Sequence, residues 1–145
     1  MSRALRTAFV GLSVLLLAHA LCGAAARAQS ASSLPAPESV RSALAILNQV
    51  VIESGQLIAA GSFDQLPRQS DQFESGATAL EQGLGASPAQ FRRDVERVLA
   101  RARVASGAMS DAAAAHRTAL LPAEHQQLAD AVRALNVLFG AQVRP

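Results

Sequence analysis

The sequence contains no lysine, no tryptophan and no tyrosine, and its single cysteine is Cys22. One cysteine cannot close an intrachain disulfide, and the absence of a CxxCH motif excludes covalently attached haem. The chain also has no glycine-rich phosphate loop. Its aromatic residues are five phenylalanines, fewer than expected for a surface on which nucleic-acid bases stack. We therefore expect no nucleic-acid partner.

The first 28 residues have the three-part layout of a secretory signal peptide. A basic start at residues 1–7 precedes an apolar run at residues 8–21, and a small-residue stretch ends in Ala26-Arg27-Ala28. The run is shorter than the roughly 20 residues needed to span a bilayer. We predict cleavage between Ala28 and Gln29, a periplasmic or secreted location, and membrane contact only through this transient segment. The alternative is an uncleaved membrane anchor.

Two special export routes are disfavoured. The twin-arginine route needs adjacent arginines, whereas Arg3 and Arg6 are separated. Lipidation of Cys22 calls for a small residue before it, and Leu21 occupies that place. Cleavage after Ala28 leaves ten arginines, eleven acidic residues and no cysteine, for a net charge of about −1. The mature chain therefore has to fold without disulfides.

Apolar residues recur at helical spacing in four stretches that follow a polar, proline-containing linker at residues 29–37. The stretches lie at residues 40–60, at 65–84, from 88 past Met109, and from Pro122 to Gly140. No stretch alternates like a strand. The sequence therefore predicts an all-α fold, a single up-down-up-down four-helix bundle over residues 38–145.

Two local signals bear on the third helix, one at its start and one in its interior. Ser87-Pro88 followed by Gln90 predicts a capping box at its start. Ser106-Gly107 is its weak point, where we expect the helix to bend or to break before a separate alanine-rich segment.

The first helix is too apolar for one neighbour to cover. Its apolar residues occupy an arc of roughly 160°, wider than the stripe of about 100° on a surface helix, and only Ser54 interrupts it. We expect this arc to contact at least two other helices. Ile52 lies on the opposite side, whose charged residues are Arg41 and Glu53. This back, around Ile52 and Ala59, is the predicted partner surface.

The two halves of the mature chain carry opposite charge, about −4 for residues 29–86 and about +3 for residues 87–145. The second helix has three acidic residues and the third begins with five arginines: Asp71, Glu74 and Glu81, then Arg92, Arg93, Arg97, Arg101 and Arg103. A short turn at Gly85–Ser87 would bring these faces together. The arginines are also a candidate site for an anionic partner. The alternative, favoured by Asp94 and Glu96, is a solvated face.

The mature chain has two histidines, His116 and His125. His116 follows Met109 by two turns on the inner face of the third helix, and about 10 Å along one axis is too far for two axial ligands of one iron. His116 with His125 is the better pair, because the intervening turn folds the last two helices together, with Glu124 as a third ligand. We expect no cofactor and hydrogen-bonded histidines. A bundle that carries a small ligand, haem or metal at the two histidines is the alternative.

Catalytic motifs are missing. No GxSxG elbow occurs, and the carboxylate pairs lie on outward helical arcs, where charge is usually solvated: Asp71 with Glu74, and Glu124 with Asp130. We therefore expect that the protein is not an enzyme.

Two short segments carry a family resemblance, Leu34-Pro35-Ala36-Pro37-Glu38 before the first helix and Leu120-Leu121-Pro122-Ala123-Glu124 before the last. They resemble the repeated motif of the periplasmic LTxxQ family of Spy-like and CpxP-like proteins. In the two copies the motif's Thr is replaced by Pro35 or Leu121, and its Gln by Glu38 or Glu124. The resemblance implies a small exported all-α protein that acts as an ATP-independent chaperone or envelope-stress modulator, generally as a cradle-shaped dimer. We expect an exported, non-enzymatic helical protein that binds polypeptides or copies of itself.

Overall fold

The computed structural model describes residues 38–142, and the side chains of residues 38–140. Its four α-helices are α2 (Glu38–Ala60), α3 (Leu66–Gly83), α4 (Ala89–Ala114) and α5 (Leu121–Gln142). Short 3-10 helices, η2 (Phe63–Gln65) and η3 (Thr118–Leu120), precede α3 and α5. No strand occurs among these residues, so the all-α prediction is confirmed. The predicted signal peptide, its cleavage site at Ala26, Ala28 and Gln29, and the linker lie outside the described residues.

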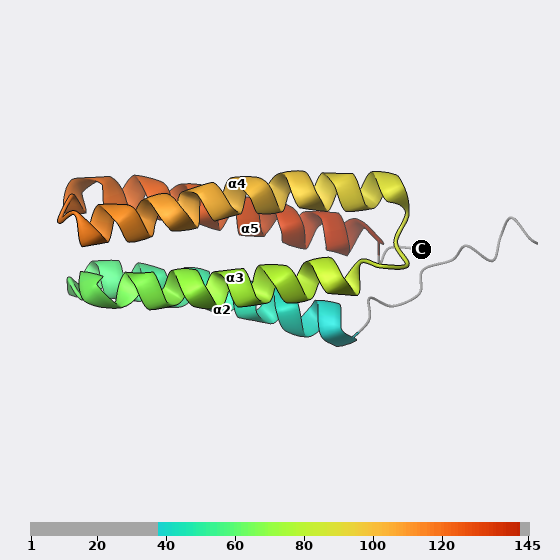
Figure 1. Cartoon of the computed structure of the whole chain (residues 1–145), viewed down its shortest axis with the longest axis horizontal. Helices are drawn as coiled ribbons and strands as arrows, with labels where there is room; N and C mark the ends of the chain where they lie inside the picture. Colours follow the sequence, from blue (N-terminus) through green and yellow to red (C-terminus); the bar gives the residue numbers. More distant parts are fainter. Residues whose placement is uncertain (1–37, 143–145) are drawn as a thin grey trace, which may run out of the picture. The chain divides into compact units, whose positions relative to one another are not determined.

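Each helix runs antiparallel to the one before it, as in the predicted up-down-up-down bundle (Figure 1). α2 packs against α3 and α5, and α4 also packs against α3 and α5. The α2–α3 and α4–α5 turns lie at one end of the bundle, and the α3–α4 turn lies at the other (Figure 1). The bundle is therefore made of two helical hairpins, α2–α3 and α4–α5, packed side by side.

The predicted apolar stripes of the helices meet in one core. Leu47 of α2, Phe73 of α3 and Leu99 of α4 are all 0% exposed. Burying a side chain of this size stabilises the fold by about 1.5–3 kcal/mol. Gly76 lets α3 approach α2 closely, because a Cβ at this position would lie 3.0 Å from side-chain atoms of both Ile46 and Leu47. Apolar burial thus holds the helices together.

The two hairpins repeat each other with an offset of 55 residues. Leu66-Pro67 begins α3 and Leu121-Pro122 begins α5, each directly after a 3-10 helix. The helices before them end alike, with a residue of left-handed backbone, Gly61 (φ 71°) after α2 and His116 (φ 55°) after α4. The next amide returns to a carbonyl of the last turn, at 2.9 Å after α2 and 2.8 Å after α4. Both turns are therefore Schellman motifs.

Polar contacts between the hairpins follow the same offset. Asn48 of α2 and Asn136 of α5 exchange two amide hydrogen bonds, of 2.8 and 3.3 Å. At the equivalent positions, Arg103 of α4 donates to both carboxylate oxygens of Glu81 of α3, at 2.7 and 3.1 Å. The bundle therefore has a pseudo-two-fold axis parallel to its helices, which relates α2 to α4 and α3 to α5.

Two local predictions about the third helix were wrong, and the structure decides a third. α4 begins at Ala89 after an extended Pro88 (φ −54°, ψ 141°) and has no side-chain cap, so the predicted capping box does not form. α4 ends at Ala114, and the Schellman turn places His116 in an exposed connection rather than on the inner helix face. α4 continues unbroken through Ser106-Gly107.

Candidate functional site

A row of exposed, uncharged side chains follows the outer face of α2. We call this row the α2 stripe: Ser42, Ala45, Gln49, Ile52, Gln56 and Ala59. Ile52, the predicted partner residue, is 54% exposed, and Ile46 beside the stripe is 42% exposed. Among the described helices, α2 is the one whose length and composition would also allow a membrane crossing, although in the bundle it packs on α3 and α5. Exposed apolar side chains on one face mark a candidate interaction surface.

The pseudo-symmetry supplies an internal comparison for this face. The equivalent row, the α4 stripe, lies 55 residues later: Arg97, Ala100, Val104, Gly107, Asp111 and Ala114. The side chain of Arg97 is 70% exposed and pairs with Asp94 of the same helix, as is usual for a solvated face. The α2 stripe has no charged position. Two equivalent surfaces of one bundle thus differ in charge.

The carboxylate of Glu53 borders the α2 stripe and is directed towards α3. It accepts hydrogen bonds from Gln49 at 2.8 Å and from Gln69 at 3.0 Å. These bonds, the one from Gln49 first, lower the pKa of Glu53 below its ordinary value. A depression of about 330 Å³ lies beside it between α2 and α3, lined by Ile46, Gln49, Val50, Glu53, Gln72 and Ser75. The surface next to the stripe therefore combines apolar and amide groups with one ionised carboxylate.

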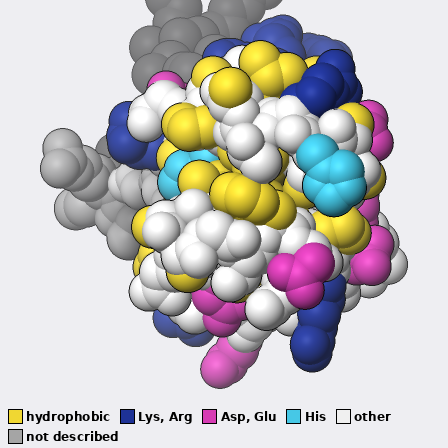
Figure 2. Space-filling model, turned by 90° about the vertical axis from the view of Figure 1, so that its left-hand side faces the viewer, with side chains coloured by type: hydrophobic (Ala, Val, Ile, Leu, Met, Phe, Trp, Pro, Cys, Tyr) yellow, Lys and Arg dark blue, Asp and Glu magenta, His cyan; other side chains and the backbone are white. Residues whose placement is uncertain are grey.

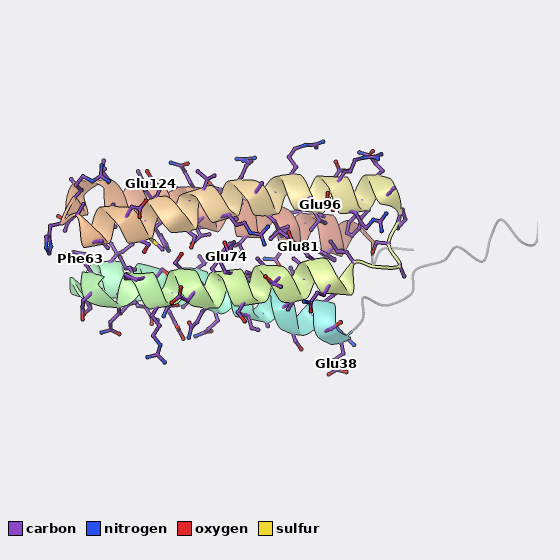
Figure 3. All side chains as sticks on the ribbon, viewed as in Figure 1. Glu38, Phe63, Glu74, Glu81, Glu96 and Glu124 are labelled. Carbon is purple, nitrogen blue, oxygen red and sulfur yellow. The ribbon has the colours of Figure 1, made fainter. Side chains whose placement is uncertain are left out.

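One member of the arginine cluster, Arg103, joins α4 to α3. Glu74 and Glu81 of α3 lie towards α4 (Figure 3), and the guanidinium bonds them at 3.0 and 2.7 Å. The hydrogen bond with Glu81 is the main cause that raises the pKa of Arg103, and it lowers the pKa of the Glu81 carboxyl. The expected meeting of the acidic and basic helices therefore occurs, through this one arginine.

The other four arginines of the cluster lie along the outside of α4: Arg92, Arg93, Arg97 and Arg101. Arg97 bonds Asp94, one turn away, at 3.1 Å, and Arg93 bonds Gln90 at 2.8 Å. Contacts of this kind within one exposed helix contribute little to stability. These local contacts are those of a solvated face, and binding of an anionic partner by the cluster stays a prediction.

The two histidines lie apart. Nε2 of His125 is 2.9 Å from the carbonyl oxygen of Val51, and its ring packs against Gly55. His116 is exposed in the α4–α5 turn. Figure 2, which faces the turn end of the bundle, shows the two histidine side chains on either side of hydrophobic surface. Within residues 38–142, no three His, Cys, Asp or Glu side chains gather as metal ligands. His125 thus serves the α2–α5 contact, and the alternative of a haem or metal at the two histidines stays a prediction.

The helical pattern of the sequence predicted one buried polar side chain, Ser54, but gave no sign that Gln69 and Ser106 are buried as well. Ser106 of α4 donates to Ser70 of α3 at 3.1 Å, whereas the Ser54 hydroxyl and the Gln69 carbonyl oxygen are buried without a partner. In the described part of the chain, none of these hydroxyls bonds a histidine, as an activated nucleophile would. The Ser106–Ser70 bond thus joins α4 to α3 inside the bundle.

No family model, no curated protein and no solved structure matches the chain. The resemblance to the LTxxQ family therefore stays a prediction, and the functional argument rests on the α2 stripe.

Proposed function

We propose that this protein is an exported, non-enzymatic helical bundle that binds polypeptides through the α2 stripe. The observation that supports the proposal is the difference between two pseudo-equivalent surfaces, charged on α4 and uncharged on α2. A chaperone-like or envelope-stress role is the form of this function that the LTxxQ resemblance implies.

The chemistry of the stripe suits a polypeptide. Ile52 offers apolar contact, the amides of Gln49 and Gln56 supply donors and acceptors that match a peptide backbone, and Ala45 and Ala59 permit close approach. Because a packed helix holds these side chains in line, a partner loses little free energy to ordering the surface. The arrangement is therefore that of a preformed docking face.

The test is the aggregation of an unfolded client protein, followed by light scattering. We expect the wild-type protein to slow aggregation, Ile52→Arg to lose most of this effect, and Val104→Arg to retain it. Val104 is the control, since it is 72% exposed and occupies the α4 position equivalent to Gln49. A strictly monomeric wild-type protein that leaves client aggregation unchanged would contradict the proposal.

A further inference from the structure

The spacing of the α2 stripe indicates what kind of partner it receives. Its six positions are separated alternately by three and four residues, from Ser42 to Ala59, and all six are exposed. A row with this spacing is the seam along which two α-helices pack lengthwise. The expected occupant is therefore a helix that lies along α2 for about five turns.

The absence of charged residues from the α2 stripe restricts which helices can bind there. Glu53, the carboxylate beside the stripe, is held towards α3 by Gln69. A helix that brought charge onto the stripe would bury that charge without a counter-charge, which is strongly unfavourable. Among the described helices, α3, α4 and α5 all expose charge, at Asp71, Arg101 and Arg133 for example. The helix whose outer face matches the α2 stripe is α2 itself.

We propose that the α2 stripe binds the α2 stripe of a second copy of this chain, antiparallel, about a two-fold axis between Gln49 and Ile52. The inference rests on the proposed function and names the partner at that site. In this register Gln49 of one copy lies beside Ile52 of the other, at the centre. Farther out, Gln56 faces Ala45, and Ala59 faces Ser42. Each outer layer includes a small residue, so the two stripes are self-complementary, as a two-fold interface requires.

The flanks of the stripe are compatible with this register. Antiparallel pairing brings the α3 side of one copy next to the α3 side of the other. The two Glu53 carboxylates lie on this side, about 7.5 Å apart along the pair at 1.5 Å per residue, each held towards its own α3 by Gln69. The two Arg41 side chains lie well apart, each towards one end of the pair. The two Glu53 carboxylates are therefore the like charges nearest the centre, and their repulsion weakens the pair. An interface one helix wide lies at the small end of specific interfaces, so the dimer should dissociate on dilution.

Sedimentation equilibrium of the full chain, as it accumulates in the expressing cell, tests the association. We expect a monomer–dimer equilibrium that Ile52→Arg weakens at least about tenfold, since both copies lose a buried isoleucine, while Val104→Arg leaves it unchanged. A wild-type chain that is monomeric at every concentration overturns the inference, and so does equal weakening by both variants. If the monomer still slows client aggregation through Ile52, the proposed function survives and this inference alone fails.

Cysteine cross-linking tests the register. In a Cys22→Ser background, Gln49→Cys should form an intermolecular disulfide in high yield. Ser42→Cys and Ala59→Cys should form little, because each residue lies about 25 Å along the pair from its own copy at 1.5 Å per residue. Equal yields at the three positions would indicate parallel pairing and overturn the proposed arrangement. Circular dichroism spectra of the variants verify that each remains folded.

Discussion

His125 of α5 lies directly against Gly55 of α2. A Cβ added to Gly55 would stand 3.1 Å from two ring atoms of the imidazole, whose Nε2 bonds the Val51 carbonyl oxygen at 2.9 Å. Gly55→Ala should therefore lower the free energy of unfolding by about 1 kcal/mol. The displaced ring loses its hydrogen bond and crowds its neighbours, which outweighs the gain in helix propensity. Urea unfolding followed by circular dichroism measures the change.

Gly107→Ala is the control for that prediction. Gly107 lies inside α4, and a Cβ there would meet nothing within 4 Å. The substitution should raise the free energy of unfolding by up to about 1 kcal/mol through propensity alone. If Gly55→Ala stabilises the bundle as much as Gly107→Ala does, the His125 contact is not part of the folded structure.

His116 stands in the left-handed conformation that its equivalent, Gly61, adopts without strain. His116→Gly should stabilise the bundle by about 1 kcal/mol, because a side chain in this conformation costs about that much. Gly61→Ala should destabilise it by a similar amount. Thermal unfolding of the two variants gives the sign of each effect, and a destabilised His116→Gly variant would contradict the paired-turn description.

The buried serines should respond in opposite directions to loss of their hydroxyls. Ser54 is 0% exposed and its hydroxyl has no partner, so Ser54→Ala should raise the free energy of unfolding by about 1 kcal/mol. Ser106→Ala should lower it by about 1 kcal/mol, because its 3.1 Å bond with Ser70 is lost. Denaturant midpoints of both variants decide the matter, and a destabilising Ser54→Ala would show that this hydroxyl is bonded.

Acid should weaken the contact between α3 and α4. The hydrogen bonds from Arg103 hold the pKa of Glu81 below its ordinary value. A lowered pKa means that the ion pair stabilises the fold above the ordinary value, and that this contribution is lost as the pH falls through the lowered pKa. The effect should be at most about 1 kcal/mol, because the Glu81 side chain is 37% exposed.

Comparison of the wild type with Glu81→Gln isolates this contribution. Their unfolding free energies should differ most at neutral pH and converge as the pH falls through the lowered pKa of Glu81. A difference that stays constant with pH would mean that the carboxylate charge of Glu81 is not what stabilises the contact.

The helices, the core stripes and the exposure of Ile52 could be predicted because they follow from helical periodicity alone. That Arg103, among five arginines, would reach α3 depends on the register between α3 and α4, which no local pattern encodes. The predicted position of His116, on the inner face of the third helix, was wrong. A glycine such as Gly61 signals a left-handed helix end in the sequence, whereas a histidine in the same conformation does not.

The 55-residue repeat was also missed in the sequence. Few residues are identical at equivalent positions, such as Leu80 with Leu135 and Pro67 with Pro122, and most exposed positions have diverged. The site depends on that divergence, since it is the comparison of α2 with α4 that distinguishes the α2 stripe. A single helix considered alone offers no such reference.

The most direct test of the central claim is a residue-resolved ¹⁵N–¹H NMR dilution series. We predict that concentration-dependent shifts are largest for amides around Gln49 and Ile52 and extend along α2 to Ser42 and Ala59, while the α4 stripe around Val104 stays unchanged. Shifts centred on α4, or spectra of the α2 amides that do not change over the whole range, would contradict the assignment of the α2 stripe as the interaction surface.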